Sequence, residues 1–339
     1  MAALIHTSLG ADASKVTLAA KDMIELLCRF ACNSISVSDG ELVNVGVGVF
    51  PTLSLMNHSC DPNCAIIFNG RTATLRSIKD IDEGEEICQS YLDLTERTSS
   101  RKKELRKRYF FDCRCSICEE EAQDVRSRYK CPKEDCDGWL NVGDDLKIKS
   151  ATCTACGPIE NTVLLELLDV IEEHRKTLID VEQAINGDAS TYDLASSTNP
   201  IHPLSLLTAP KPALHTLRKT FILQTSQLCH PTTTDLLRTR RLLLDALLSH
   251  QSFPQAYDMA TEQMTALQQI FTLHHPAISV LALMRYKLAA WCWPEDVGRL
   301  RGLAKEAVEL LEVSHGREQG LCREAVEALE GLSTMGGAG

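Results

Sequence analysis

The residues best able to do chemistry lie in one short stretch of the sequence. Positions 57–64 read Asn-His-Ser-Cys-Asp-Pro-Asn-Cys and bring together two amides, an imidazole and two thiols. The Asp-Pro pair favours a turn rather than a regular element, and the apolar run over 49–56 predicts a buried strand that ends there. So many polar and metal-capable groups directly behind a buried strand indicate a binding site rather than packing alone.

A second set of chemically capable residues forms two cysteine pairs. They follow the patterns C-x4-C and C-x2-C, are separated by sixteen residues, and comprise Cys131, Cys136, Cys153 and Cys156. Two such pairs on tight turns can enclose one tetrahedral Zn²⁺ as a small zinc ribbon. We expect a structural role for this metal, because four thiolates leave no open position for water.

The remaining cysteines divide into a third group and isolated residues. The chain has 15 cysteines, and residues 1–20 show no basic segment followed by an apolar core, so we expect metal-bound and free thiols rather than disulfides. The third group, Cys113-x-Cys115-x2-Cys118, has one thiolate fewer than a tetrahedral shell. Six others are expected to be small buried hydrophobic residues: Cys28, Cys32, Cys88, Cys229, Cys292 and Cys322.

The elements that must position these groups form a small, irregular β region behind one helix. Apolar residues at helical spacing predict the helix over 13–32, and an extended segment follows at 35–37. An Asn-Gly pair between 65–68 and 71–76 predicts a β-hairpin. The final strand is expected over 86–91.

Two further features border this region. Gly46 and Gly48 alternate with valines, which is typical of a strand or loop that another backbone or a ligand approaches closely. Over 95–110 the sequence is charged and helical. We expect its basic residues to form a solvated helix face, with a substrate or cofactor contact as the alternative.

From residue 160 onward the sequence predicts only amphipathic helices. Pro254 and Pro276 lie near predicted helix starts, where a fixed φ is tolerated. Helix pairs joined by short turns indicate a solenoid similar to tetratricopeptide repeats (TPR), although no clean period of about 34 residues can be read. The segment 188–203 predicts a loose loop and 335–339 a disordered tail. The first core stripe is expected at Leu164, Leu165, Leu168, Ile171 and Leu178.

Length and charge limit the possible functions. The 339 residues leave room for two or three domains. A formal net charge of −11 argues against a general nucleic-acid binder, which needs a basic face, and is favourable for a basic partner such as a lysine-rich tail. No apolar run approaches the ~20 residues that span a bilayer.

Several segments together resemble one known family. The stretch 57–64, the run NVGVGVFP over 44–51, the residues GEE and SYLD within 84–93, and the cysteines of 113–118 are similar to the C-terminal half of a SET domain with its post-SET cysteines. With the helical tail, the resemblance is closer to the SET-and-MYND (SMYD) family of protein-lysine methyltransferases. It is specific over 33–118 and diffuse through the tail.

The resemblance implies transfer of a methyl group from S-adenosylmethionine to a lysine of a histone or another protein. Tyr91, in the pattern Tyr-Leu-Asp, matches the active-site tyrosine of the family, and Tyr109 matches a second tyrosine of the lysine channel. Ile35 stands where the family often has a phenylalanine. This departure could widen the channel or change the number of methyl groups added.

The resemblance also assigns residues to the cofactor. Asn57 and His58 match the Asn-His pair that contacts S-adenosylmethionine, Asn33 matches a further polar contact, and Phe111 matches an aromatic side chain that packs on the adenine. The alternative for His58 is a core histidine that satisfies a backbone group.

For the third cysteine group, the resemblance supplies a fourth ligand. In the family it is the cysteine of the Asn-His-Ser-Cys stretch, here Cys60, with Cys64 as the alternative. This zinc would hold the segment that carries Tyr109 and Phe111 against the cofactor site, so metal binding would be coupled to formation of the lysine channel.

The expected fold is α+β, with four parts. They are a SET portion with its preceding helix (1–110), a post-SET zinc segment (111–122), a zinc-ribbon-like insert (129–158) and a TPR-like all-α domain (160–335). A complete family member also has earlier SET strands, with a Gly-rich cofactor loop and a MYND zinc finger. Ahead of Asn33 this sequence has one helix and a short leader, so we expect an N-terminally truncated chain with an incomplete cofactor site.

Two hypotheses from different classes follow. The first is a protein-lysine N-methyltransferase that uses S-adenosylmethionine and contains about two zinc ions. The second is a non-catalytic, zinc-containing adaptor that binds protein partners through its helical tail. A zinc-ribbon nucleic-acid binder is disfavoured by the net charge. The sequence is compatible with the cytoplasm, the nucleus or both.

Overall fold

The structure is a computed structural model that describes residues 20–143, 146, 148, 150–186 and 209–335. The start of the predicted first helix, the loop predicted at 188–203 and most of the predicted tail lie outside these residues. The described helices are α2 (Ala20–Asn33), α3 (Thr98–Tyr109), α4 (Ser116–Glu119), α5 (Asn161–Asn186), α6 (Lys211–Leu223), α7 (Thr234–Ser249), α8 (Phe253–Leu267), α9 (Pro276–Cys292), α10 (Val297–Ser314) and α11 (Gly320–Met335).

The described strands form short pairs rather than one continuous sheet. Antiparallel pairs join β1 with β2, β4 with β5, β7 with β8 and β9 with β10, while β3 and β6 are parallel. The strands are β1 (Ser34–Ser38), β2 (Asn44–Val49), β3 (Asn57–His58), β4 (Cys64–Asn69), β5 (Thr72–Ser77), β6 (Cys88–Gln89), β7 (Arg128–Lys130), β8 (Trp139–Asn141), β9 (Thr152–Cys153) and β10 (Gly157–Pro158). Short helical turns are η2 (Leu53–Leu55), η3 (Glu121–Gln123), η4 (Val125–Ser127) and the π-helical η5 (Gln224–Leu228).

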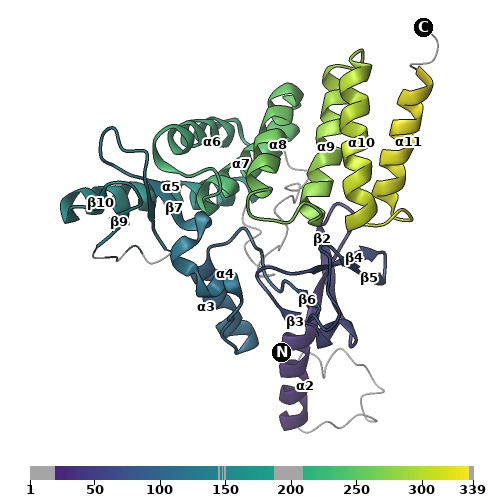
Figure 1. Cartoon of the computed structure of the whole chain (residues 1–339), viewed down its shortest axis with the longest axis horizontal. Coiled ribbons are helices and arrows are strands. Elements are labelled where there is room, and N and C mark those ends of the chain that lie inside the picture. The colour runs from purple at the N-terminus through teal and green to yellow at the C-terminus, as the bar shows by residue number, and fades with distance from the viewer. Residues whose placement is uncertain (1–19, 144–145, 147, 149, 187–208, 336–339) are drawn as a thin grey trace.

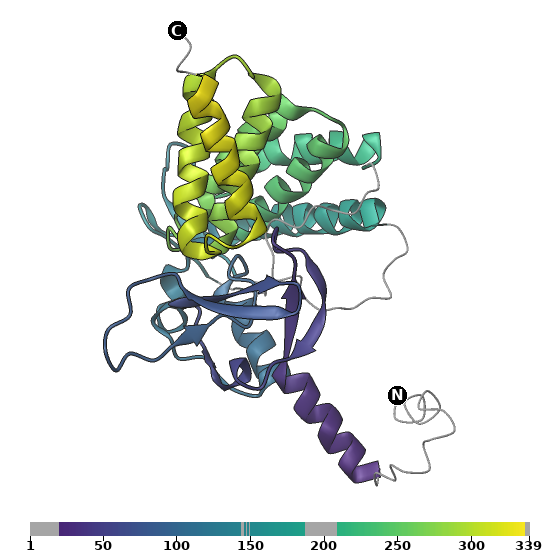
Figure 2. The same ribbon diagram turned by 90° about the vertical axis from the view of Figure 1, so that its right-hand side faces the viewer.

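The chain is arranged as a strand-rich part, residues 34–158, and a helical part, residues 161–335. Consecutive helices from α5 to α11 pack against one another in chain order (Figure 1). The helical part covers one side of the strand-rich part, and α2 projects away from the other side (Figure 2). Within the described ranges, no helix is both long and apolar enough to cross a membrane.

Local sequence signals correctly predicted several elements. β4 and β5 form the expected hairpin, and Gly70 in its turn has a φ of +57°, which glycine adopts without a steric cost. Gly48 is required by packing, because an added Cβ would lie 2.8 Å from the ring of Phe50. Pro254 and Pro276 both occupy the first turn of a helix, as expected.

Two strand predictions were wrong. The run 49–56 is not a buried strand: β2 ends at Val49, a helical turn follows, and Leu55 is 82% exposed. The strand expected over 86–91 is reduced to β6, which pairs with β3 over two residues. The side chain of Asn63 forms hydrogen bonds with backbone groups at and beside β6. It accepts from Cys88 N–H and donates to the Glu86 carbonyl, each at 2.9 Å.

Three burial predictions were also wrong. Leu165 is 57% exposed because it points away from the neighbours of α5, whereas the rest of its predicted stripe is buried. Cys28 is exposed on the projecting α2, and of the six isolated cysteines only Cys229 and Cys322 are buried. Arg101 does not belong to a solvated face, since it is 1% exposed.

A buried ionic network fixes the two parts against each other. Asp235 of α7 accepts hydrogen bonds from Arg97 and from the Tyr129 hydroxyl. It also forms an ion pair with Arg175 of α5 at 3.1 Å. Burial opposes the charge of Asp235, but the two guanidinium groups outweigh it and lower the pKa of this carboxyl to about 2. On the far side, Arg76 of β5 donates to the carbonyl of Val313 at 2.8 Å, at the end of α10.

Candidate functional site

Four of the predicted site residues form one aromatic cluster. The ring centroids of Tyr91 and Tyr109 are 4.8 Å apart, and those of His58 and Tyr91 are 5.3 Å apart. Phe111 closes the cluster, with its ring 6.1 Å from His58 and 6.4 Å from Tyr91. These residues come from β3, the segment after β6, the end of α3 and the segment after it, so the fold brings together positions far apart in the sequence.

Tyr91 is held with its phenol oxygen in a defined position. Its hydroxyl donates a hydrogen bond to the backbone carbonyl of Met56. Burial and the neighbouring Tyr109 raise the pKa of Tyr91. The phenol therefore stays protonated at neutral pH, and its remaining oxygen lone pair can accept a hydrogen bond.

His58 connects the aromatic cluster to the cysteines. Its Nδ1 accepts a hydrogen bond from the backbone N–H of Tyr91 at 3.0 Å, so in the neutral ring the proton lies on Nε2. That atom lies 3.3 Å from Cys60 Sγ. Burial lowers the pKa of His58 to about 4, so the ring is neutral at physiological pH. Because both ring nitrogens have protein partners, a contact from this residue to a ligand would come from its ring face or its backbone.

A cavity of about 350 Å³ opens beside the two tyrosines. Its lining includes Asn33, Ile35, Tyr91 and Tyr109, so four predicted site residues share one cavity. It has polar groups beside an apolar wall, which is the usual character of a small-ligand site. Ile35 lies on β1 opposite Gly48, and its position leaves an aliphatic rather than an aromatic surface at that point of the wall.

The two predicted amide contacts lie at the surface. Asn33 ends α2, where its amide donates to the Arg29 carbonyl at 2.7 Å. Asn57 is exposed and donates to a carboxylate oxygen of Glu86 at 2.6 Å. Asn57 thus lies outside the cavity lining, whereas Asn33 belongs to it.

The fold gathers one group of cysteines around the turn after β3. The sulfur atoms of this first cluster all lie within 4.8 Å of one another, and its members are Cys60, Cys113, Cys115 and Cys118. The Sγ atoms of Cys60 and Cys118 are 3.5 Å apart, close to the ~3.8 Å edge of a tetrahedron with Zn–S bonds of ~2.3 Å. The donor set therefore fits Zn²⁺. Cys64 lies outside this cluster and lines the cavity instead.

A second cluster has the same composition. It consists of the two predicted pairs, Cys131, Cys136, Cys153 and Cys156, again with all sulfurs within 4.8 Å. The distances Cys131–Cys156 and Cys136–Cys153 are both 3.7 Å, which also fits tetrahedral zinc. Gly138 lies so close that an added Cβ would be 2.2 Å from Cys153 Sγ.

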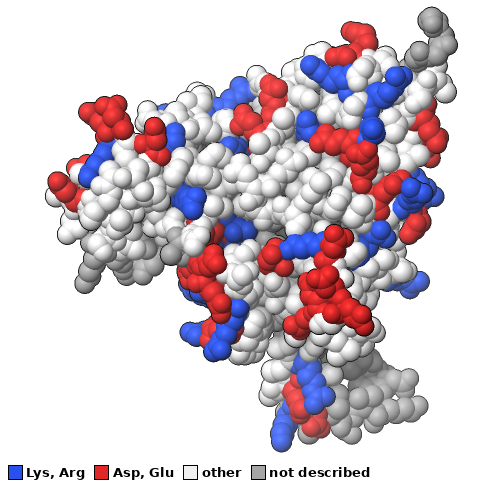
Figure 3. Space-filling model, in the orientation of Figure 1, with Lys and Arg blue, Asp and Glu red and all other residues white. Residues whose placement is uncertain are grey.

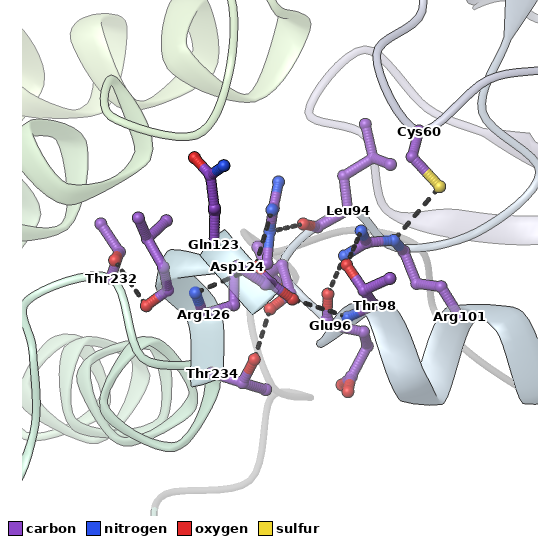
Figure 4. A network of polar contacts seen from close by, with 12 residues as sticks. Cys60, Leu94, Glu96, Thr98, Arg101, Gln123, Asp124, Arg126, Thr232 and Thr234 are labelled. Carbon is purple, nitrogen blue, oxygen red and sulfur yellow. Dashed lines mark hydrogen bonds and ion pairs between the residues drawn. The ribbon is translucent and has the colours of Figure 1, made fainter. Parts of the chain in front are cut away.

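Two contributions to the site were missed in the sequence. The cavity is completed by the segment before α9, including Phe271 and His275, whose rings stack with centroids 4.0 Å apart. The only signal there was a histidine pair ahead of Pro276, which is too weak to indicate a contact with residues far away in the chain. The second omission is Arg101, which donates from Nε to Cys60 Sγ at 3.3 Å (Figure 4).

Comparisons with known proteins show which family this chain is similar to. Residues 14–92 match the family model of the SET domain. Over 303 residues, 87% of this chain and 58% of the relative, the chain is 28% identical to the histone-lysine N-methyltransferase ASHR1 of Arabidopsis thaliana. It is 43% identical to the human histone-lysine N-methyltransferase SMYD3 over 114 residues, 34% of this chain and 26% of the relative. It is 41% identical to the N-lysine methyltransferase SMYD2-B of Danio rerio over 103 residues, 30% of this chain and 24% of the relative. The matched stretches thus span less than two thirds of each relative.

Proposed function

We propose that this chain is an S-adenosylmethionine-dependent protein-lysine N-methyltransferase of the SMYD type of SET-domain proteins. The observation that carries the proposal is the pair Tyr91 and Tyr109, which line one cavity with their rings 4.8 Å apart. A partly aromatic cavity with a fixed phenol oxygen suits a lysine side chain whose amine must be oriented and kept from water.

The reaction places specific demands on these side chains. Bound S-adenosylmethionine supplies a methyl group on a sulfonium. A free lysine amine has a pKa of about 10.4, and burial in a cavity disfavours its charged form, so the proton is released to solvent before transfer. The Tyr91 oxygen, whose own proton is directed to the Met56 carbonyl, accepts a hydrogen bond from the neutral amine and orients its lone pair. Ile35 sets the width of the channel and so influences the number of methyl groups that fit.

Asn33, His58 and Phe111 are proposed to form the surface that holds the cofactor, with Asn57 at its edge. Phe111 offers an aromatic face for the adenine, and His58 keeps Tyr91 and the adjoining backbone in place through its Nδ1 contact. We assign zinc to both clusters, because both donor sets fit it. In the first cluster the metal joins Cys60 to the segment that carries Tyr109 and Phe111.

The surface charge favours a basic protein substrate. Acidic groups gather over the region of β3 and β6 on the face drawn in Figure 3. The exposed run before β6 contains Asp82, Glu83, Glu85 and Glu86. A lysine-rich segment of a histone or another protein would be attracted to this face, in the cytoplasm, the nucleus or both. The helical part would bind further protein partners through its TPR-like array.

The test is calorimetric titration of the zinc-loaded chain with S-adenosylmethionine. We expect micromolar binding that is lost in His58→Ala and retained in His215→Ala, which removes an exposed histidine of α6. Methylation of histone substrates would then be measured.

The competing adaptor function makes a different prediction. A wild-type chain that is folded and retains about two zinc ions, but gives no heat with S-adenosylmethionine and methylates no protein, would refute the enzymatic proposal. It would favour the non-catalytic adaptor, whose helical part alone would account for binding to partners.

A further inference from the structure

Arg101 is buried at the first cysteine cluster, although its sequence context is that of a surface helix. It lies in the first turn of α3 within a run of basic residues, yet only 1% of it is exposed. Neighbouring residues of the same run, Arg106 and Lys107, are exposed. The fold thus buries the guanidinium of Arg101 and leaves these neighbouring cations in contact with water.

The partners of the guanidinium define its role. Its Nε donates to Cys60 Sγ at 3.3 Å, one terminal nitrogen donates to Thr98 Oγ1 at 2.9 Å, and the other donates to the Glu96 carbonyl (Figure 4). None of these acceptors is a carboxylate. A buried cation needs a compensating negative charge. Among the atoms that the guanidinium contacts, only the sulfur, as a thiolate, can provide one, and the nearby buried carboxylate of Asp124 is shared with Arg126.

Cys60 Sγ receives two N–H groups from different directions. Arg101 Nε and His58 Nε2 each lie 3.3 Å from it. Four thiolates around one divalent cation leave a net charge of about −2, which a nearby cation and N–H donors stabilise. The two donors thus fix the sulfur between the metal centre and the aromatic cluster.

We propose that Arg101 is a positioning residue that compensates the charge of the first metal centre and holds Cys60 where its sulfur orients His58. This inference rests on the proposed function, because it takes the first cluster to be a zinc centre beside the cofactor surface. It adds to that site a residue that belongs neither to the four cysteines nor to the cavity lining. Its effect is transmitted through the Cys60 sulfur.

The helix that carries Arg101 is itself held in place from outside. Asp124 Oδ2 accepts a hydrogen bond from Thr98 N–H at 2.7 Å and thereby caps the start of α3. Arg126 is linked to the same carboxylate and donates from Nε to the Leu94 carbonyl at 2.6 Å. These contacts hold the start of α3 in place, so the helix cannot easily move to compensate for the loss of the Arg101 side chain. Lys103 offers a control on the same helix, since it is an exposed cation and takes part in none of the hydrogen bonds named above.

The experiment measures zinc release from the full chain into an excess of a chromogenic chelator. The second cluster serves as an internal reference, and Cys156→Ser identifies its kinetic phase. In Arg101→Met we expect zinc to leave the first cluster about 10- to 100-fold faster than in wild type. Release from the second cluster should be unchanged, and Arg101→Lys should be intermediate. Lys103→Met, which removes an exposed cation from the same helix, should leave both phases near the wild-type rates.

Equal release rates in wild type and Arg101→Met, or equal acceleration in Lys103→Met, would overturn the inference. Where Arg101→Met does not fold, ¹¹³Cd NMR of the cadmium-loaded Arg101→Lys variant replaces it. One of the two resonances should then shift relative to wild type, and two unchanged resonances would overturn the inference. A wild-type chain that binds zinc only at the second cluster would instead refute the zinc assignment in the proposed function.

Discussion

The phenol of Tyr91 donates its hydrogen bond to the backbone carbonyl of Met56, the residue directly before Asn57. This contact fixes the direction of the oxygen, because the phenol proton is committed to the protein and the free lone pair must point elsewhere. The same tyrosine receives support from His58 through its own backbone N–H. The segment 56–58 therefore orients Tyr91 at two points.

Tyr91→Phe should abolish most methyl transfer while leaving the fold intact. Removing one fixed polar group at a reacting centre costs about 100-fold or more in kcat, whereas the lost hydrogen bond to Met56 costs about 1 kcal/mol of stability. Radiolabelled methyl transfer and thermal unfolding measure the two effects. Tyr257→Phe makes the same chemical change on α8, away from the cavity, and should retain wild-type activity. Full activity in Tyr91→Phe would remove this residue from the mechanism.

Gly138→Ala should selectively destroy the second cysteine cluster. A Cβ at this position would lie 2.2 Å from Cys153 Sγ and 3.0 Å from the backbone nitrogen of Ala155, so neither neighbour can yield without displacing a metal ligand. We expect metal analysis to find about one zinc fewer per chain. Gly143→Ala is the control, because its nearest neighbour, Ser99 Oγ, would be at an ordinary 3.8 Å. Retention of both zinc ions in Gly138→Ala would contradict the geometry of this cluster.

The sequence was sufficient where the determinants are local. The Asn69-Gly70 pair predicts the β4–β5 hairpin because a tight turn needs a residue that accepts a positive φ. Gly70 supplies that residue, whereas Asn69 is the last residue of β4 and pairs with Thr72. The spacing of the cysteine pairs likewise indicates the second cluster, because each pair lies on a single turn. These features depend on a few neighbouring residues and little on the rest of the fold.

The sequence was insufficient where distant segments meet. Arg101 lies in a basic run whose pattern indicates solvent exposure, and its burial depends on Cys60, 41 positions away. Phe271 and His275 reach the cavity from the helical part, and no local pattern specifies which helix end covers a strand-rich part. At Leu55 the pattern predicts burial and the structure shows exposure. The apolar run 49–56 predicts a buried strand, whereas a helical turn there exposes the Leu55 side chain.

Asp235→Asn should strongly destabilise the contact between the two parts. The carboxylate is buried between Arg97 and Arg175, and removing one partner of a buried ion pair costs about 3–5 kcal/mol because the remaining charge stays uncompensated. Chemical denaturation monitored by circular dichroism measures the change. Asp258→Asn alters an exposed carboxylate on α8 and should change stability by no more than about 0.5 kcal/mol. If Asp235→Asn changed the free energy of unfolding as little as Asp258→Asn, the ionic network would contribute little to stability.

Stability should fall as the pH is lowered from 7.5 to 5.5, partly because of His315. This residue is 1% exposed at the end of α10, where its Nδ1 lies 2.7 Å from Ser314 Oγ. Burial lowers the pKa of His315 to about 4, with the nearby Arg76 acting in the same direction. The unfolded chain, with a pKa of about 6.5, therefore binds a proton in this interval that the folded chain does not.

The sign of the effect follows from that difference. Above pH 6.5 this histidine is neutral in the folded and the unfolded chain, so it does not change the free energy of unfolding. Between pH 6.5 and about 4, each unit of acidification favours the unfolded state by about 1.4 kcal/mol. Wild type should thus lose about 1.4 kcal/mol at pH 5.5 through this residue. His315→Asn keeps a polar atom near the position of Nδ1. Its free energy of unfolding, measured in urea at the two pH values, should fall by about 1.4 kcal/mol less than that of wild type. Parallel losses in the two proteins would mean that His315 does not control this dependence.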